Sequence, residues 1–176
     1  AGILVLGPRL GRFAADGSPR LIPGHNLSLV TLGAFILWVG WFGFNAGSTL
    51  KVDVNLGLIA LNTHLAAAAG AVGAVLALRS TSSPVLLTTT VNGALGGLVG
   101  ITAGCASMAP GFAILTGLIA GFVVVYGMAL MDTLRLDDVV GAVPVHGMAG
   151  VWGTLAAGLF FSGDLFNPDR VMIQLL

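Results

Sequence analysis

The sequence predicts an all-α membrane protein, a polytopic bundle of helices. Of its 176 residues, 56% are hydrophobic and only 8% are charged, whereas soluble proteins carry about 25% charged residues. Five segments of 20 to 24 residues contain no Asp, Glu, Lys or Arg: 27–50, 56–78, 85–104, 111–131 and 139–162. Because about 20 apolar helical residues span a bilayer core of about 30 Å, each segment is long enough to cross a membrane.

Other classes of protein fit this composition poorly. A soluble protein would have to bury five consecutive apolar helices inside one large bundle. The seven basic and seven acidic residues balance to a net charge of zero, so nothing indicates a nucleic-acid partner. Cys105 is the one cysteine, so the chain cannot form an internal disulfide framework. No pattern predicts catalytic residues, a cofactor or a metal site.

The two ends of the sequence are apolar but short. Residues 1–7 would form about 10 Å of helix, which is too short to span a bilayer. We interpret them as the end of an earlier membrane helix, and residues 171–176 as the beginning of a further one. The sequence 1–176 is therefore expected to be a partial domain, truncated at both ends.

The first full segment, 27–50, ends in an aromatic and glycine-rich stretch, WVGWFGFNAGS at 38–48. Large rings near the end of a spanning helix are typical of the aromatic belt at the headgroup level. Glycines between the rings instead favour a shaped aromatic site, because they let other backbones approach closely. The residues alone leave both interpretations open.

The second segment, 56–78, contains His64 in the stretch LNTHLAAAAGA. This imidazole lies about 12 Å from the start of its helix, and an ionisable residue inside a membrane is a functional candidate by default. Asn62, Thr63 and the alanines that follow instead favour a neutral histidine, bonded within a tight contact between helices. We expect a structural role for His64.

Small residues recur every four positions in three of the segments: Ala66, Gly70 and Ala74; Gly96, Gly100 and Gly104; Gly117 and Gly121. Such spacing lets helix backbones approach closely in lipid, where no hydrophobic force drives helices together. We therefore predict packing seams there. Uncharged polar residues are expected to bond between helices or back to the backbone: Asn62, Asn92, Thr88, Thr89 and Thr90.

The last segment, 139–162, contains His146 in VPVHGMAGVWG, about 10 Å from its start. Pro144 removes one backbone hydrogen bond and kinks or strains the turn. Gly147 and Gly150 leave room beside the imidazole for a partner or a substrate. His146 is thus the strongest candidate for chemistry, and the alternative is a hydrogen-bonded histidine of the core.

Two acidic residues, Asp137 and Asp138, come directly before this last segment. Aspartate is a preferred N-cap because its carboxylate accepts hydrogen bonds from the free N–H groups of the first turn. We expect both residues to be N-caps.

The connecting segments predict the orientation of the helices. Five of the seven basic residues fall in 1–26, 79–84 and 132–138, and two fall in 51–55, 105–110 and 163–176. Cytoplasmic connections are enriched in Lys and Arg. The first set, which includes the N-terminal region, is therefore expected to be cytoplasmic.

Four stretches resemble the ammonium transporter family (Amt/Mep, related to the Rh proteins): GWFGFNAGS at 40–48, LNTHLAAAAGA at 61–71, GITAGCASMAPGFAILTGLIAG at 100–121 and LDDVVGAVPVHGMAGVWGTLAAGLF at 136–160. They occur in order and cover essentially the whole chain. The resemblance implies an eleven-helix fold of two inverted halves. The chain would run from the end of the fifth helix through the tenth, which is close to the second half.

The resemblance also implies roles for particular residues. Phe44 resembles the second of two stacked phenylalanines that close the outer vestibule. Ser48 resembles the hydroxyl of the outer ammonium recruitment site, and Trp41 lines the same region. His146 resembles the second of two paired pore histidines; the first would lie before residue 1. A homotrimer in the plasma membrane, with no cofactor and with a PII-type signal protein as a cytoplasmic partner, is implied as well.

The implied activity is transport of ammonium, with deprotonation of the ion and conduction of ammonia through a hydrophobic pore. Potassium resembles ammonium in size and charge but has no proton to give up, and a neutral species avoids most of the cost of an ion in the membrane. Histidine suits this task because it exchanges protons near neutral pH. Without the first pore histidine, residues 1–176 alone are not expected to conduct.

Two alternatives remain open. An ammonium sensor could use the same fold to bind the ion and signal through an attached domain. A helical transporter half with another cargo is the second alternative, which the order of the motifs disfavours.

Overall fold

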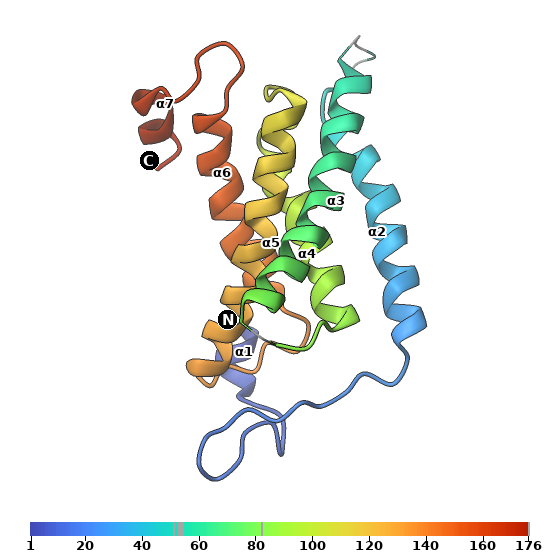
Figure 1. Ribbon diagram of the computed structural model, residues 1–176, viewed down its shortest axis with the longest axis vertical. Coiled ribbons are helices and arrows are strands. Elements are labelled where there is room, and N and C mark those ends of the chain that lie inside the picture. Colours follow the sequence, from blue (N-terminus) through green and yellow to red (C-terminus); the bar gives the residue numbers. More distant parts are fainter. Residues whose placement is uncertain (51, 53–54, 82, 176) are drawn as a thin grey trace.

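A computed structural model describes all residues of the chain except 51, 53–54, 82 and 176. Its regular elements are helices: α1 Gly2–Leu6, α2 Leu27–Gly47, α3 Leu56–Ser80, α4 Leu87–Thr102, α5 Pro110–Thr133, the π-helix η1 Val143–Met148, α6 Ala149–Leu159 and α7 Pro168–Ile173. Within the described part, β-structure amounts to one isolated bridge between Phe13 and Pro19. The longer helices stand side by side (Figure 1), so the prediction of an all-α fold is confirmed.

Each of the five uncharged segments contains a helix, but two of these helices are shorter than expected. By length and composition α2, α3 and α5 can cross a membrane, with 21, 25 and 24 residues. In contrast, α4 has 16 residues, and η1 and α6 have 6 and 11. Leu86 is extended, which delays the start of α4. Gly141 has a φ of 75°, and the last helix begins after it. The helices therefore occupy only part of the uncharged segments 85–104 and 139–162.

The centre of the bundle is α3, which packs against α4 and α5; these two helices also pack against each other. The predicted seams lie at these contacts. A Cβ atom added to Gly97 of α4 or Gly117 of α5 would overlap the carbonyl oxygen of Ala66. A Cβ atom on Gly121 would likewise overlap the carbonyl oxygen of Gly70. The three backbones approach so closely that only glycine fits, which confirms the packing role of the small residues.

Three of the predicted polar side chains, Asn62, Asn92 and Thr90, donate to backbone carbonyl groups. Asn62 of α3 donates from Nδ2 to the carbonyl oxygens of Cys105 and Met108, each at 2.9 Å. Asn92 of α4 donates to the carbonyl oxygen of Val140 at 3.0 Å. Thr90 bonds back to its own helix, through Leu86. Asn62 thereby satisfies carbonyl groups of the turn between α4 and α5, where no helix partner exists.

The helix α2 lies at the flank of the bundle and is attached at few points (Figure 1). Asn45 is its one buried residue. Large apolar side chains such as Phe35 and Ile36 are more than half exposed. An apolar helix with so little cover within the chain is stable in lipid or against another protein surface.

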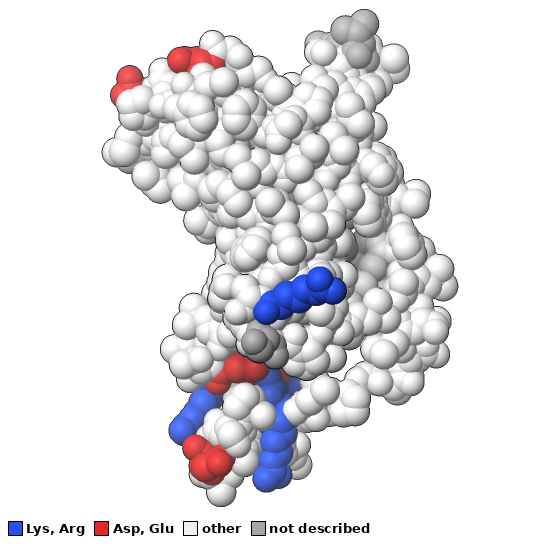
Figure 2. Space-filling model, viewed as in Figure 1, with Lys and Arg blue, Asp and Glu red and all other residues white. Residues whose placement is uncertain are grey.

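Charged side chains gather toward the two ends of the molecule, with a broad uncharged surface between them (Figure 2). The connections before α2, between α3 and α4, and between α5 and η1 all lie at one end, the lower end in Figure 1. These are the connections for which a cytoplasmic location is predicted. Their grouping at one end agrees with helices that cross a membrane in alternating directions.

We predict that Gly117→Ala lowers the thermal unfolding midpoint of the protein in detergent. The added methyl group must displace the backbone at Ala66, and overpacking of this kind costs about 1–3 kcal/mol. Gly40→Ala is the matched control, because a Cβ atom there meets nothing within 4 Å. Equal midpoints for the two variants would contradict the seam.

We further predict that Ser18 and Ser162 lie on opposite sides of the membrane. Both are exposed, so each can be replaced by cysteine in a background where Cys105 is alanine. A membrane-impermeant thiol reagent should label Ser18→Cys from the cytoplasmic side and Ser162→Cys from the outside. Labelling of both from one side would refute the orientation.

Candidate functional site

The aromatic residues at the end of α2 form a cluster with Ser48. The rings of Trp41 and Phe44 meet edge to face, with centroids 5.7 Å apart and planes at 68°. Phe44 is 58% exposed. Ser48 is exposed, and its hydroxyl donates to the carbonyl oxygen of Phe44. The structure therefore brings together Trp41, Phe44 and Ser48, the three residues predicted for the outer gate and recruitment site. We call them the outer cluster.

Two hydrogen bonds fix the outer cluster to the rest of the bundle. Trp41 donates from Nε1 to Oγ1 of Thr102 on α4, at 2.9 Å. Asn45, which is 3% exposed, donates from Nδ2 to Oγ1 of Thr63 on α3, also at 2.9 Å. Thr63 donates in turn to the carbonyl oxygen of Ile59. Sequence reasoning did not single out Asn45 or Thr102, although an amide beside Phe44 in an apolar helix was a usable signal.

His146 lies on η1, the π-helix that begins the last helical segment. A π-helix has i→i+5 hydrogen bonds, and such turns are rare and often mark functional sites. The Ala149 N–H donates to the carbonyl oxygen of Pro144 in this pattern. His146 is exposed, and a Cβ atom on Gly147 or Gly150 would come no closer than 3.7 Å to any neighbour. The imidazole therefore has the space beside it that the sequence predicted.

The outer cluster and His146 lie at different depths of the bundle. The outer cluster is at the upper end of α2, whereas η1 follows the connection at the lower end (Figure 1). In the part of the chain that the structure describes, no hydrogen bond or ring contact joins the two. No three His, Cys, Asp or Glu side chains come together as a metal site among these residues.

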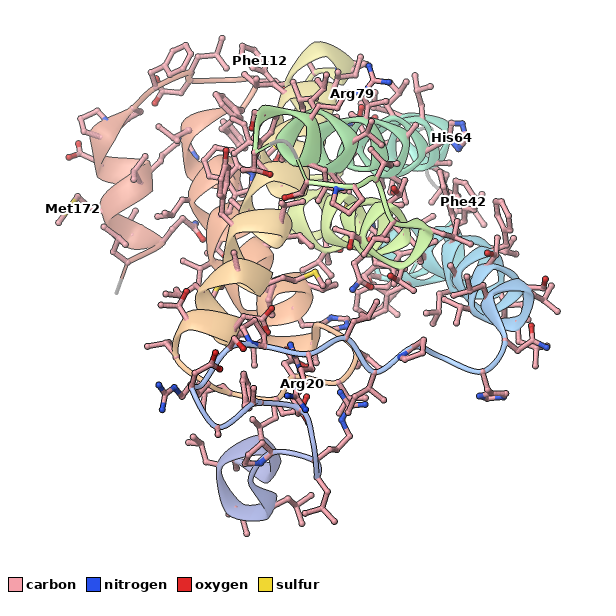
Figure 3. The ribbon with its side chains drawn as sticks, turned by 60° about the horizontal axis from the view of Figure 1, so that its bottom comes forward. Arg20, Phe42, His64, Arg79, Phe112 and Met172 are labelled. Atoms are coloured by element: carbon pink, nitrogen blue, oxygen red, sulfur yellow. The ribbon has the colours of Figure 1, made fainter. Side chains whose placement is uncertain are left out.

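His64 does not lie in a tight helix contact, so that expectation was wrong. Asn62 and Thr63 point into the bundle, and the next residue of the helix faces outward and is exposed. The imidazole packs against two rings of α2, with its centroid 5.4 Å from Trp38 and 6.5 Å from Phe42. Figure 3 shows His64 and Phe42 close together at the flank of the bundle.

The two aspartates before η1 have different roles. Asp138 accepts hydrogen bonds from the N–H groups of Ala142 and Val143, at 2.9 and 2.7 Å. Its carboxylate therefore caps the first turn from the preceding loop, although the residue at the N-cap position is Ala142. Asp137 is not a cap, which corrects the prediction for this residue. Its carboxylate instead accepts three hydrogen bonds from Arg9, from the backbone N–H, Nε and NH2, at 2.7 to 2.9 Å.

Arginines hold Asp137 in its ionised form. The Asp137 side chain is 2% exposed, with Arg12 Nε 3.4 Å away as a second cation. The hydrogen bond from Arg9 lowers the pKa of Asp137 to about 2, although burial acts in the opposite direction. The same pair raises the pKa of Arg9. Arg12 also pairs with Asp132 at the end of α5. We call Arg9, Arg12, Asp132 and Asp137 the ionic clasp.

The fold and the site together define a polytopic helical membrane protein with an aromatic and hydroxyl cluster at one end and an accessible imidazole on a π-helix. Residues 1–174 match the Ammonium Transporter Family. The chain belongs to this family, and the resemblance seen in its motifs is confirmed.

Individual relatives and solved structures agree with this assignment. Ammonium transporter Amt2 of Archaeoglobus fulgidus is 51% identical over 93% of this chain and 35% of its own length. A putative ammonium transporter of Synechocystis sp. is 47% identical, over 91% of this chain and 38% of its own. The structure called Sensor Amt Protein superposes with a TM-score of 0.91 at 40% identity, and covers 99% of this chain. Candida albicans Mep2 gives a TM-score of 0.84 at 25% identity.

The chain is shorter than the proteins that it matches. It spans 35% and 38% of the two transporters. It spans 44% of the Sensor Amt Protein and 41% of Mep2.

We predict that the ion pair of Asp137 stabilises the protein at neutral pH and is lost only in strong acid. An unfolded aspartate has a pKa of about 3.9, and the folded pKa is about 2. Between these values the unfolded chain binds more protons, so the stabilisation is complete above about pH 4 and disappears as the pH falls through about 2. Thermal midpoints of wild type and Asp137→Asn should therefore differ most from pH 5 to 8, approach each other below about pH 4 and converge below about pH 2. A constant difference would contradict the assignment.

Proposed function

We propose that the protein transports ammonium across a membrane, and that residues 1–176 supply part of the pathway. The observation that carries the proposal is the outer cluster, in a chain that belongs to the Ammonium Transporter Family. Its relatives carry the name ammonium transporter. The cluster offers aromatic faces and a hydroxyl at the end of a spanning helix.

The outer cluster suits a small cation. The faces of Trp41 and Phe44 attract a cation by about 2 kcal/mol when water is excluded. The Ser48 hydroxyl uses its hydrogen in the bond to the Phe44 carbonyl. Its lone pairs therefore remain free to accept an N–H group of ammonium.

His146 suits the removal of a proton. An ion deep in a bilayer is costly, so ammonium crosses more readily once it has given up its proton. A neutral imidazole with open space beside it can hydrogen-bond ammonia or exchange a proton with it near neutral pH. In this proposal His146 acts as one of two paired pore histidines, and discrimination against potassium follows because potassium cannot be deprotonated.

The proposal extends to the setting of the protein. We infer a multi-pass location in the plasma membrane, a homotrimeric assembly and a cytoplasmic face that a PII-type signal protein can bind. The apolar exposed surface of α2 supports burial in lipid or against a neighbouring subunit.

A second candidate function is that of an ammonium sensor. The structure with a TM-score of 0.91 to this chain is called a Sensor Amt Protein. A sensor would use the outer cluster to bind ammonium and would show no flux. Isothermal binding and liposome flux, measured on the same full-length protein, separate the two functions: binding without flux favours the sensor.

We predict that His146→Ala in the full-length protein lowers ammonium transport at least about a hundredfold, the usual contribution of a proton-transferring side chain. Folding should be preserved, because the imidazole is exposed within the chain. His146→Glu keeps a group that exchanges protons but loses the imidazole geometry, and it should relax discrimination against potassium. Uptake and current with each ion in proteoliposomes provide the measurement.

His64→Ala is the control for these variants. It removes the ring contacts with Trp38 and Phe42, which are worth about 0.5–1.5 kcal/mol, and should lower stability without altering selectivity. If His64→Ala changed selectivity while His146→Ala left transport intact, the two roles would be reversed.

A further inference from the structure

Asp137 and Asp138 are neighbours in the chain, yet their carboxylates bind different parts of the molecule. Asp138 holds the first turn of the helix that carries His146. Asp137 holds Arg9, which lies 128 residues earlier. One peptide bond therefore joins the ionic clasp to the cap of η1.

The cap provided by Asp138 completes the hydrogen bonding of the first turn. A helix begins with N–H groups that have no partner in the helix. Here the Ala142 and Val143 N–H groups bind Asp138, Pro144 has none, and the Val145 N–H binds the carbonyl oxygen of Gly141 at 3.0 Å. Asp138 thus satisfies both donors that the backbone leaves free.

The start of the helix fixes the direction of His146. In a π-helix the rotation about the helix axis from one residue to the next is smaller than in an α-helix, because each turn contains more residues. His146 is four residues beyond Ala142, so a shift of the first turn would be carried along the helix to the imidazole.

The loop before η1 is attached to the rest of the chain through the ionic clasp and through Asn92. A small cavity of about 60 Å³ lies between the ionic clasp and this loop, and its lining includes Arg12, Asp138, Gly141 and Pro144. Asn92 of α4 holds the loop at the Val140 carbonyl, and Asp137 holds it through Arg9 and Arg12.

We propose that Asp137 is a positioning residue for His146: it fixes the loop from which Asp138 caps η1. The N-terminal segment 9–20 then helps to fix the orientation of the imidazole, although it lies outside the helices. Only the transport measurements below rest on the proposed function.

Hydrogen exchange on the full-length protein tests the positioning itself. Asp137→Asn should speed exchange of the amides in 142–148 about tenfold or more, the effect of losing a hydrogen bond to a charged group. Exchange in the centre of α3 should not change. Asp132→Asn is the matched control, because it also removes a partner of Arg12 but is not next to the cap; it should change exchange in 142–148 less than about twofold.

Arg9→Gln is a second variant, which leaves both aspartates in place and guards against misfolding of Asp137→Asn. It should speed exchange in the same residues. Unchanged exchange in 142–148 in a folded Asp137→Asn or Arg9→Gln protein overturns the proposal, as does an equal effect of Asp132→Asn.

The selectivity of transport is an independent measurement, which a purely structural role of Asp137 would leave unchanged. Asp137→Asn should relax discrimination between ammonium and potassium, and Asp137→Glu, which keeps the charge, should restore it. Normal selectivity in Asp137→Asn overturns the proposal. Absence of ammonium transport in the wild type would refute the proposed function, while the exchange data would still decide the positioning role.

Discussion

The structure depends on the close approach of three helix backbones at Ala66 and Gly70 of α3. In lipid this contact cannot be driven by the exclusion of water, so van der Waals contact between backbones and buried hydrogen bonds must hold the helices. The contact fixes α4 beside α3, and α4 then supports both parts of the candidate site. Thr102 of α4 accepts a hydrogen bond from the indole N–H of Trp41. Asn92 of α4 donates one to the loop before η1. Glycine at the seam thus determines geometry at residues it never touches.

The helices themselves could be predicted from the sequence because the membrane imposes a length and forbids charge. All five uncharged segments contain a helix, and the seams at Gly117 and Gly121 follow from the spacing of small residues, whereas Gly97 was not among the predicted positions. The helix boundaries were less predictable than the helices. Uncharged residues are compatible with helix but also with the extended backbone at Leu86 and the left-handed backbone at Gly141. The π-helix at 143–148 leaves no clear signal beyond Pro144, because its pattern of hydrogen bonds depends on packing against α5.

The candidate site was predictable where its residues are close in the sequence. Trp41, Phe44 and Ser48 lie on two turns of one helix, so their clustering follows from helical spacing. The partners of Asp137 were not predictable: two adjacent aspartates before a helix both fit the description of a cap, and only the folded chain brings Arg9 to one of them. His64 shows the same limit. Asn62 and Thr63 face the bundle, whereas His64, the next residue along the helix, faces outward, and the sequence pattern does not locate a face to within one residue.

The sparse attachment of α2 has a consequence for how its sequence can change over evolution. Asn45 is its one buried residue, so within the chain most positions of α2 need only be apolar, whereas α3 has ten buried positions that accept few substitutions. The surface of α2 can therefore diverge quickly in response to a different lipid composition or a different neighbouring subunit. The residues at its end can still keep their geometry, because Trp41 and Asn45 are fixed by hydrogen bonds that do not depend on the rest of the helix surface. Adaptation to a new membrane and retention of ligand chemistry are thus assigned to different residues of one helix.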